Sequence, residues 1–464
     1  MDKPLPSYAP IHEALLEAIC QAVGAECVMR HAAKLADFAR DATPLERIPE
    51  LVVEPTETAQ IQALMRLANV HRFPVTPRGL GTGLAGGAVP VCGGVVLSLA
   101  KMNRILEVDR GNLIAVVEPG VINADLKKAA HHAGLFYPPD PASFETCSIG
   151  GNAATNAGGS SCVKYGTTRD YVLGLEAVLP GGEVISTGVQ TRKGVVGYDL
   201  THLLVGSEGT LAVITKLILK LLPRPPAVGT IAAVFSQLTD AMAAVTAILN
   251  NGLSPCAMEF LDRNCLELVG ELLPFDSVQH AGAFLLIQAD GPPALVDAEV
   301  EKMGEVCLRH GAFDVVMAPD SYKRERMWEV RRQVSTTIEH NSAVYVPEDI
   351  VVPIARIAEF VDILPQFEDR YGFKIYSFGH AGDGNIHLNI TAHSKNALQR
   401  VEQGIHAILQ KVVDMGGTIS GEHGIGFAKK HFLHLELSPT SLQLQRDLKR
   451  LFDPNLILNP GKIF

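Results

Sequence analysis

A glycine-rich stretch in the first quarter of the chain, PRGLGTGLAGGAVP at residues 77–90, is the feature that most constrains the fold. It contains Gly81-x-Gly83-x-x-Gly86 and so matches the fingerprint of a dinucleotide-binding Rossmann domain. In that domain the fingerprint opens directly into a helix, whose N-terminus receives the pyrophosphate. Here the loop is followed by VVLSL at residues 95–99, a run that is typical of a buried strand. The context therefore excludes a Rossmann domain, although the glycines still allow a ligand to approach the backbone closely.

A second glycine-rich segment covers residues 137–166, with the sequence YPPDPASFETCSIGGNAATNAGGSSCVKYG, and is predicted to be a long irregular loop. Small residues dominate it, so that few side chains are left to fill a core. Loops of this length inside a compact domain usually carry function. The first glycine-rich segment alone is explained equally well by tight turns between strands. Two of them in one α/β region favour a dinucleotide that lies extended across both.

The organisation of the chain predicts more than one domain, as expected for 464 residues. Short apolar strands alternate with helices up to PRPPAV at residues 223–228, which predicts a stiff link. After this link a strand–helix–strand pattern occurs twice. The repeat predicts a ferredoxin-like α+β sheet with helices on one face.

Composition narrows the function classes. The formal net charge of -10 argues against nucleic acid as a partner, and no apolar run has the length of a membrane span. The eight cysteines form no C-x-x-C pair. This usage is typical of reduced thiols in a cytoplasmic protein and offers no ligand set for an iron–sulfur cluster.

Two glycine-flanked motifs, GHAGDGNIHLNI (379–390) and SGEHGIG (420–426), carry the other chemistry. His380 and His387 are separated by a turn-forming stretch, which predicts facing strands that direct both rings to one place. Two imidazoles and the carboxylate of Glu422 suit a divalent ion such as Zn²⁺, Mn²⁺ or Fe²⁺. The alternative is that these side chains only satisfy loop backbone groups. With His423, which follows Glu422, the two motifs contain four polar groups, and this number favours a metal site over the alternative.

Taken together, PRGLGTGLAGG, the segment from PPDP to KYG, and LLVGSEGTLAVIT resemble the FAD-binding domain of the vanillyl-alcohol oxidase and p-cresol methylhydroxylase superfamily. The branch that they resemble most contains FAD-linked D-2-hydroxy-acid dehydrogenases, such as D-lactate dehydrogenases and the FAD subunit of glycolate oxidase. The resemblance implies an α+β fold in four parts. These are an N-terminal helical segment (1–48), a two-part FAD-binding domain (49–224), a ferredoxin-like cap domain for the substrate (225–420) and a C-terminal segment that returns to the FAD domain (421–464).

The resemblance also implies the cofactor and its contacts. FAD is expected to bind without a covalent bond, because the first loop lacks the histidine to which some members attach the flavin. The matching positions in the two loops and in two later segments are Pro77, Arg78, Gly79, Gly81, Thr82, Gly83, Pro138, Asp140, Cys147, Ser148, Gly150, Gly151, Asn156, Gly159, Tyr165, Gly166, Ile214 and Asn459.

Finally, the resemblance implies a metal site and a reaction. At the matching positions, His380, His387 and Glu422 are the metal ligands and His423 is the catalytic base. Arg331 is the cation that pairs with the substrate carboxylate. Asn389 shares a strand face with His387 and completes the predicted catalytic residues. A metal makes a chelated hydroxyl easier to deprotonate, and the base takes the proton while a hydride passes to the flavin.

The expected substrate is a short monocarboxylate. Ser335 stands where dicarboxylate-specific members have Thr, and residues 346–349 lack their Lys. D-lactate or glycolate is therefore favoured over D-2-hydroxyglutarate. Electrons are expected to pass to electron-transferring flavoprotein or to an iron–sulfur subunit, through which the protein could associate with a membrane. The alternatives are an alkyl-glycerol-phosphate synthase-like transferase and a non-catalytic FAD subunit.

Overall fold

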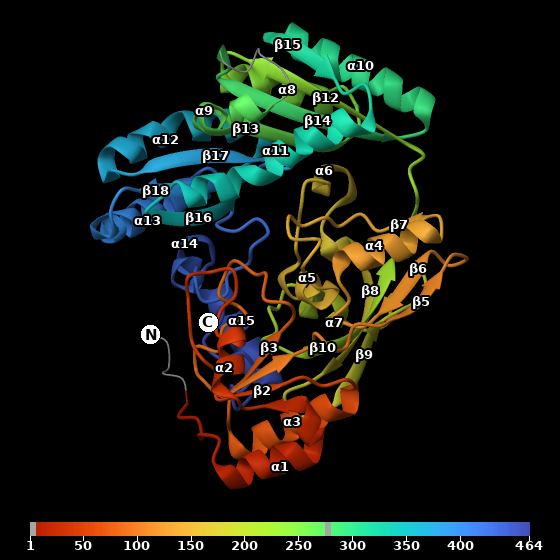
Figure 1. Cartoon of the computed structure of the whole chain (residues 1–464), viewed down its shortest axis with the longest axis vertical. Coiled ribbons are helices and arrows are strands. Elements are labelled where there is room, and N and C mark those ends of the chain that lie inside the picture. The colour runs from red at the N-terminus through yellow and green to blue at the C-terminus, as the bar shows by residue number, and fades with distance from the viewer. Residues whose placement is uncertain (1–5, 274–279) are drawn as a thin grey trace. The chain divides into compact units, whose positions relative to one another are not determined.

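The computed structural model describes residues 6–273 and 280–464, so residues 1–5 of the predicted N-terminal segment lie outside the described part. The chain divides into two compact units. Figure 1 shows the course of the chain, coloured by residue number. Unit 1 comprises Met1–Ala157, Thr167–Arg224 and Glu422–Phe464, and unit 2 comprises Gly158–Gly166 and Pro225–Gly421. The four predicted domain ranges assign segments to the cofactor and the substrate, and they stay a prediction.

The first sheet of unit 1 has the order β1 (Val28–Met29), β2 (Leu51–Val53), β4 (Val95–Ser98) and β3 (Val75–Arg78). Strands β2 and β3 both run parallel to β4. A parallel connection needs a crossover, and α3 (Thr58–His71) supplies it between β2 and β3. The preceding helix, α1 (Glu13–Val23), packs against α3.

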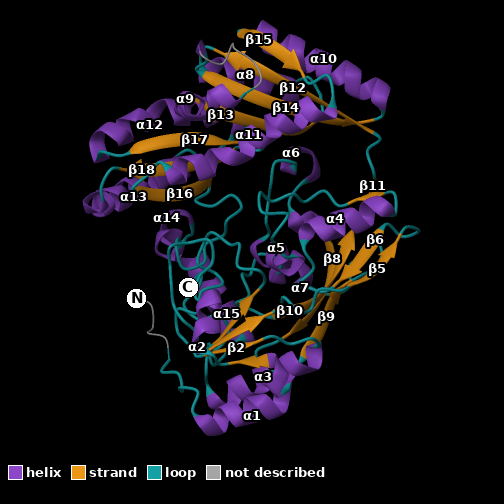
Figure 2. Cartoon of the chain, viewed as in Figure 1, coloured by secondary structure: helices purple, strands orange, loops and turns teal. Residues whose placement is uncertain are grey.

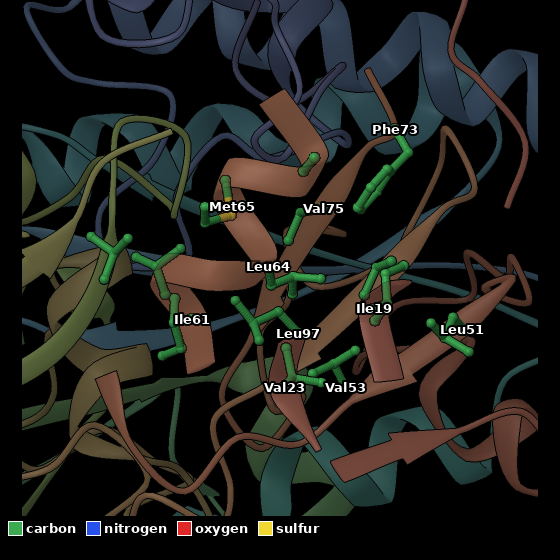
Figure 3. Close-up of a cluster of buried hydrophobic side chains, with 14 of the residues drawn as sticks. Ile19, Val23, Leu51, Val53, Ile61, Leu64, Met65, Phe73, Val75 and Leu97 are labelled. Atoms are coloured by element: carbon green, nitrogen blue, oxygen red, sulfur yellow. The ribbon is translucent and has the colours of Figure 1, made fainter. Parts of the chain in front are cut away.

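The core of this region lies between the sheet and the two helices (Figure 3). The apolar residues of α3 recur with helical spacing at Ile61, Leu64 and Met65, and all three side chains are fully buried. Val75 of β3 and Leu97 of β4 meet them from the sheet. This core fixes the end of β3, from which the first glycine-rich loop departs.

The second sheet of unit 1 is antiparallel throughout, with the order β5 (Ile105–Asp109), β6 (Ile114–Val117), β10 (Val213–Lys220), β8 (Val172–Val178) and β9 (Val184–Gly188). The other elements of this unit are α2 (Ala32–Leu35), α4 (Asn123–His132), β7 (Leu135–Phe136) paired with β11 (Leu222–Pro223), α7 (Leu200–Leu204), α14 (Leu433–Glu436) and α15 (Pro439–Phe452).

The second glycine-rich segment is more regular than predicted. It contains two short helices, α5 (Ile149–Thr155) and α6 (Cys162–Tyr165). The Ser148 side chain caps α5 by accepting a hydrogen bond from the Gly151 amide. The prediction of a wholly irregular loop was wrong because a serine N-cap outweighs the low helix propensity of the following glycines.

Unit 2 is built on one antiparallel sheet, shown between its helices in Figure 2, with the order β15 (Ala312–Met317), β12 (Ala227–Phe235), β14 (Ala283–Gly291), β13 (Pro255–Asp262), β17 (Lys374–His380), β18 (Asn385–Ala392) and β16 (Val344–Val351). Helices α8 (Leu238–Asn250) and α10 (Pro293–Arg309) complete the two predicted strand–helix–strand repeats. Two further helices, α12 (Ile357–Tyr371) and α13 (Leu398–Asp414), pack against each other.

Helices cover both faces of this sheet, not one face as predicted. Gly229 of β12 lies against Val300 of α10. The residues on the opposite face of β12, Ala232 and Val234, share a buried cluster with α9 (Arg263–Val269) and α11 (Ser321–His340). The strands are buried on both faces and therefore lack the polar alternation that reveals a one-sided sheet. Among residues 6–273 and 280–464, no helix has both the length and the apolar character that a bilayer crossing demands.

Candidate active site

The two predicted flavin loops lie against each other in unit 1. Gly79 follows β3 directly, and a Cβ atom placed on it would lie 2.3 Å from the Ser148 Oγ. A Cβ on Gly150 would lie 2.5 Å from the Pro119 Cβ. Residues 79–94 form turns and bends without a helix before β4 begins, which confirms the predicted local structure. A side chain at Gly79 or Gly150 would therefore collide with neighbouring atoms, whereas Gly83 has open space around it.

Further predicted cofactor residues stand around these loops. The buried Asn459 side chain donates from Nδ2 to the carbonyls of Gly87 (3.0 Å) and Glu208 (2.8 Å). Arg78 is also buried, and its Nη1 donates to the Arg40 carbonyl (2.7 Å). Burial lowers the pKa of the Arg78 guanidinium. The C-terminal segment thus holds the first glycine-rich loop within unit 1.

The remaining predicted cofactor residues are distributed as follows. Pro77, Gly81, Thr82, Gly83, Pro138, Asp140, Cys147, Gly151, Asn156 and Ile214 also belong to unit 1, whereas Gly159, Tyr165 and Gly166 belong to unit 2. Within unit 2 the Tyr165 hydroxyl donates to Asp290 Oδ2 (2.7 Å), and Lys164 Nζ contacts Asp290 Oδ1 (2.6 Å). The role of Tyr165 toward the flavin stays a prediction.

A buried carboxylate joins two of the predicted catalytic residues in unit 2. Glu259 lies opposite His380 in the β13–β17 register, and its Oε1 is 2.5 Å from His380 Nδ1. Its Oε2 accepts hydrogen bonds from Arg331 Nε (2.8 Å) and Nη2 (2.6 Å). Burial alone would raise the pKa of Glu259, but the charges of His380 and Arg331 outweigh it and lower the pKa to about 2. The carboxylate is therefore ionised at neutral pH.

The predicted histidine pair forms as expected from its facing strands. His380 ends β17 and His387 lies in β18, with their ring centroids 5.3 Å apart and edge to face. Asn389 follows two residues later on β18, and its Oδ1 accepts from the Tyr345 hydroxyl (2.7 Å). Within the described residues, the buried Asn389 Nδ2 has no hydrogen-bond partner. An orphaned donor of this kind is suited to a ligand oxygen.

Asp349 was not predicted as a site residue. It lies opposite His387 in the β16–β18 register, and each of the two residues offers a ligand atom within 4.8 Å of the other. The fully buried Asp349 carboxylate also accepts from Ser420 Oγ (3.1 Å) and from the Gly421 amide (2.8 Å). Asp349 thus anchors the chain directly before Glu422.

The chain beyond this anchor is held by a second unpredicted carboxylate, which lies in unit 1. Glu208 accepts from the amides of Ile425 (2.8 Å) and Gly426 (2.7 Å). Burial raises the pKa of Glu208 to about 7, although these two bonds favour its ionised form. Glu422 and His423 precede this anchor, with 4.0 Å between Glu422 Oε1 and His423 Nε2. Both predicted functional residues therefore lie directly before a segment that Glu208 holds within unit 1.

Sequence reasoning missed Glu259, Asp349 and Glu208, yet a signal for them existed. Glu259 stands within CAMEFLD, an otherwise apolar strand, and Asp349 follows a similar run. Carboxylates are almost never fully buried unless a partner accompanies them. An acidic residue inside a predicted core strand therefore indicates a cation or a ligand nearby.

Comparisons with known proteins agree with this fold. A family profile described as "FAD binding domain" matches residues 49–188, and one described as "FAD linked oxidases, C-terminal domain" matches residues 224–463. The chain is 40% identical over 430 residues to the glycolate oxidase subunit GlcD of Bacillus subtilis (strain 168), with 92% of each chain covered. It is 39% identical over 425 residues to a D-lactate dehydrogenase of Anaerostipes hadrus, with 89% of each covered.

The solved structure of p-cresol methylhydroxylase with substrate bound is also similar in fold. The TM-score is 0.80 at 19% identity, with 97% of this chain and 96% of that chain covered. Fold and matches together define a flavin-dependent oxidoreductase. The chain belongs to the family of FAD-linked oxidases, and it shares the fold of p-cresol methylhydroxylase. The predicted α+β fold class is confirmed, as is the assignment to FAD-dependent enzymes.

Proposed function

We propose that the protein oxidises a short D-2-hydroxy acid, D-lactate or glycolate, to the 2-oxo acid with the help of FAD and a divalent metal ion. The relatives that are named D-lactate dehydrogenase and glycolate oxidase subunit support this substrate class. The observation that carries the proposal is the buried cluster of unit 2. In it, Glu259 joins Arg331, a cation with the geometry to bind a carboxylate, to a histidine of the His380–His387 pair.

The residues present fit both cofactors. The close approach of Gly79 to Ser148 leaves bare backbone, which suits an extended dinucleotide. For the metal, His380 directs Nδ1 to a carboxylate, the arrangement typical of a metal-bound histidine. We propose His380, His387 and Glu422 as the metal ligands, as the family resemblance implies. Asp349, which offers an oxygen within 4.8 Å of a His387 ring nitrogen, is a further donor in this proposal.

The chain's own residues account for binding and proton transfer. When bound, FAD accepts the hydride and the metal polarises the substrate hydroxyl. Arg331 holds the substrate carboxylate by charge-assisted hydrogen bonds, and Asn389 Nδ2 donates to a substrate oxygen. His423 takes the hydroxyl proton on a ring nitrogen as the hydride leaves Cα.

The lack of a lysine at residues 346–349 favours a monocarboxylate. Residues 346–349 read Val-Pro-Glu-Asp, and the side chains of Glu348 and Asp349 are buried acids. An acidic strand disfavours a second substrate carboxylate, which is why D-2-hydroxyglutarate is the runner-up. We further propose a protein electron acceptor, either electron-transferring flavoprotein or an iron–sulfur subunit, and a cytoplasmic location. The relative GlcD is itself named as a subunit.

The test is anaerobic reduction of the bound flavin, followed by its absorbance. D-lactate, L-lactate, glycolate and D-2-hydroxyglutarate are each added to the protein before and after removal of metal with a chelator. We expect bleaching by D-lactate or glycolate, its loss after chelation and its return with one added metal. Bleaching only by D-2-hydroxyglutarate would replace the proposed substrate. If the metal-loaded protein is bleached by no acid, and if in a separate assay no acid leads to reduction of an artificial acceptor, a non-catalytic FAD subunit would be favoured.

A further inference from the structure

Glu259 contacts two side chains that the proposed reaction uses for different purposes, and among residues 6–273 and 280–464 these two account for the hydrogen bonds of its carboxylate. Its carboxylate is 2% exposed and has His380 on one oxygen and Arg331 on the other. The Arg331 guanidinium also lies over the Phe378 ring, 4.5 Å from its centroid. Strand, helix and ring therefore leave the carboxylate a single orientation, with Oε1 toward His380 and Oε2 toward Arg331.

This orientation determines where the proton of His380 lies. Arginine has only donors, and an ionised carboxylate has only acceptors. His380 Nδ1 must therefore carry a hydrogen that it donates to Glu259 Oε1. A protonated His380 carries a hydrogen on both ring nitrogens, and when it gives one up Glu259 retains the hydrogen on Nδ1, so the lone pair is left on Nε2, the nitrogen directed away from Glu259. A neutral ring with its lone pair on Nε2 is the form that binds a metal.

We propose that Glu259 is a positioning residue that holds His380 in its metal-binding tautomer and fixes Arg331 for the substrate carboxylate. The inference rests on the proposed function, because it assigns Glu259 to the same metal and substrate. One buried carboxylate then couples the two binding events. The competing explanation is a structural ion pair that only neutralises Arg331 inside the unit.

Glu259→Gln separates these explanations while keeping the shape of the side chain. Because Arg331 can only donate, the new amide must turn its oxygen toward Arg331 and its NH₂ toward His380 Nδ1. His380 then has to accept on Nδ1 and carry its hydrogen on Nε2, where it blocks the metal. We expect the affinity of the FAD-loaded, metal-stripped protein for Zn²⁺ and Mn²⁺ to fall about 10- to 100-fold.

A second substitution is expected to reverse the loss of metal affinity. In Glu259→Gln/Arg331→Met the cation is gone, so the amide is free to rotate and to offer its oxygen to His380 Nδ1–H. We expect the double variant to regain most of the metal affinity, while KM for the hydroxy acid stays high. Arg331→Met alone should bind metal as wild type does, because Glu259 still accepts from His380. Mere structural damage by the first substitution would not be repaired by a second one in the same cluster.

The matched control is Asp262→Asn on the same strand. Asp262 is also a buried carboxylate, which accepts from Ser377 Oγ (2.6 Å) and from the Cys265 amide (2.8 Å), groups outside the metal and substrate cluster. Its replacement makes a similar change in the core, and we expect metal affinity to be unchanged. Flavin content and circular dichroism establish that each variant is folded.

The outcomes are distinct. Wild-type affinity in a folded Glu259→Gln variant would overturn the inference, and so would weak binding that persists in the double variant. If Glu259→Gln alone does not fold, the double variant decides by itself, because it contains no unpaired buried charge. Wild-type protein that binds neither Zn²⁺ nor Mn²⁺ would instead refute the metal in the proposed function.

Discussion

At the scale of single residues, Arg331 is a buried charge that is stabilised by an ion pair with Glu259. Its side chain is only 12% exposed, and two of its donor nitrogens bind Glu259. A buried guanidinium without a carboxylate would carry a large desolvation cost. The pairing removes that cost and at the same time fixes the plane of the guanidinium, and a fixed plane favours two-point recognition of a carboxylate.

Arg331→Lys should therefore impair substrate binding more than stability. Lysine keeps the positive charge for Glu259 but loses the planar pair of donors. The loss of one charge-assisted hydrogen bond, about 1.5–3 kcal/mol, corresponds to a rise in KM of about 10- to 100-fold. Steady-state kinetics and a thermal melt check this, and a KM equal to that of wild type would remove Arg331 from substrate binding.

His423→Ala should affect the chemical step instead. If His423 takes the hydroxyl proton, flavin reduction slows by about 10²- to 10⁴-fold, while KM and flavin content stay near wild type. Stopped-flow absorbance of the flavin measures the rate. The exposed His131 near the end of α4 offers a matched control, and His131→Ala should reduce its flavin at the wild-type rate. Equal rates of flavin reduction in His423→Ala and His131→Ala would show that His423 is not the catalytic base.

At the scale of elements, the positions of the two predicted flavin loops depend on where β3 ends and where α5 begins. β3 ends at Arg78 because the following glycines leave the sheet, and α5 begins at Ser148 through its side-chain cap. Gly81 has φ +74°, a backbone conformation that favours glycine. The two ends meet where Gly79 contacts Ser148, so both loops are positioned by one contact.

Gly79→Ala should disrupt this contact and with it the binding of FAD. The added methyl group would overlap the Ser148 Oγ, so the hydroxyl has to turn away and its cap on α5 is lost. We expect purified protein with little bound flavin and a lower melting temperature of the apoprotein. Gly83→Ala is the control for the apoprotein, because no atom lies within 4 Å of a Cβ at that position. If the two apoproteins melt at the same temperature, the contact between the loops is not structurally important.

At the scale of the whole molecule, each of the two compact units is built from segments that are not contiguous in the sequence. Residues Gly158–Gly166 leave the second glycine-rich loop to join unit 2, and Glu422–Phe464 returns to unit 1 after the long second unit. In that returning segment Lys449 Nζ, also buried, contacts Asp453 Oδ2 (2.6 Å) and the Leu458 carbonyl (2.8 Å). Buried charges such as these make the stability of the molecule sensitive to pH.

The titration of Glu208 predicts the direction in which the stability changes with pH. Its pKa rises from 4.5 to about 7 on folding, so its stabilising contribution is fully present below pH 4.5 and is lost as the pH rises through 7. The change amounts to about 3 kcal/mol of unfolding free energy. Relative to wild type, Glu208→Gln should thus become more stable by this amount between pH 4.5 and pH 8. Urea denaturation at several pH values measures the difference, with the exposed Glu183→Gln as a control that stays flat. A flat difference for Glu208→Gln as well would mean that the carboxyl titrates normally.

The sequence by itself determined the local features of this protein. A glycine fingerprint followed by a strand excluded the Rossmann fold, and periodicity predicted both the strand–helix–strand repeats and the facing strands of His380 and His387. The motifs in combination indicated the FAD-linked family. These features depend on neighbours in the chain, and such neighbours can be read in order.

Only the tertiary structure decided which distant residues act together. Glu259 meets Arg331 across 72 positions of the sequence and His380 across 121, and Glu208 reaches Gly426 across 218. No local pattern encodes such pairings, because they arise when strands and helices from separate segments bury their charged side chains in one place. A buried carboxylate is stable only with its partners. The fold therefore determines which groups meet, and through Glu259 it also determines which nitrogen of His380 carries the proton.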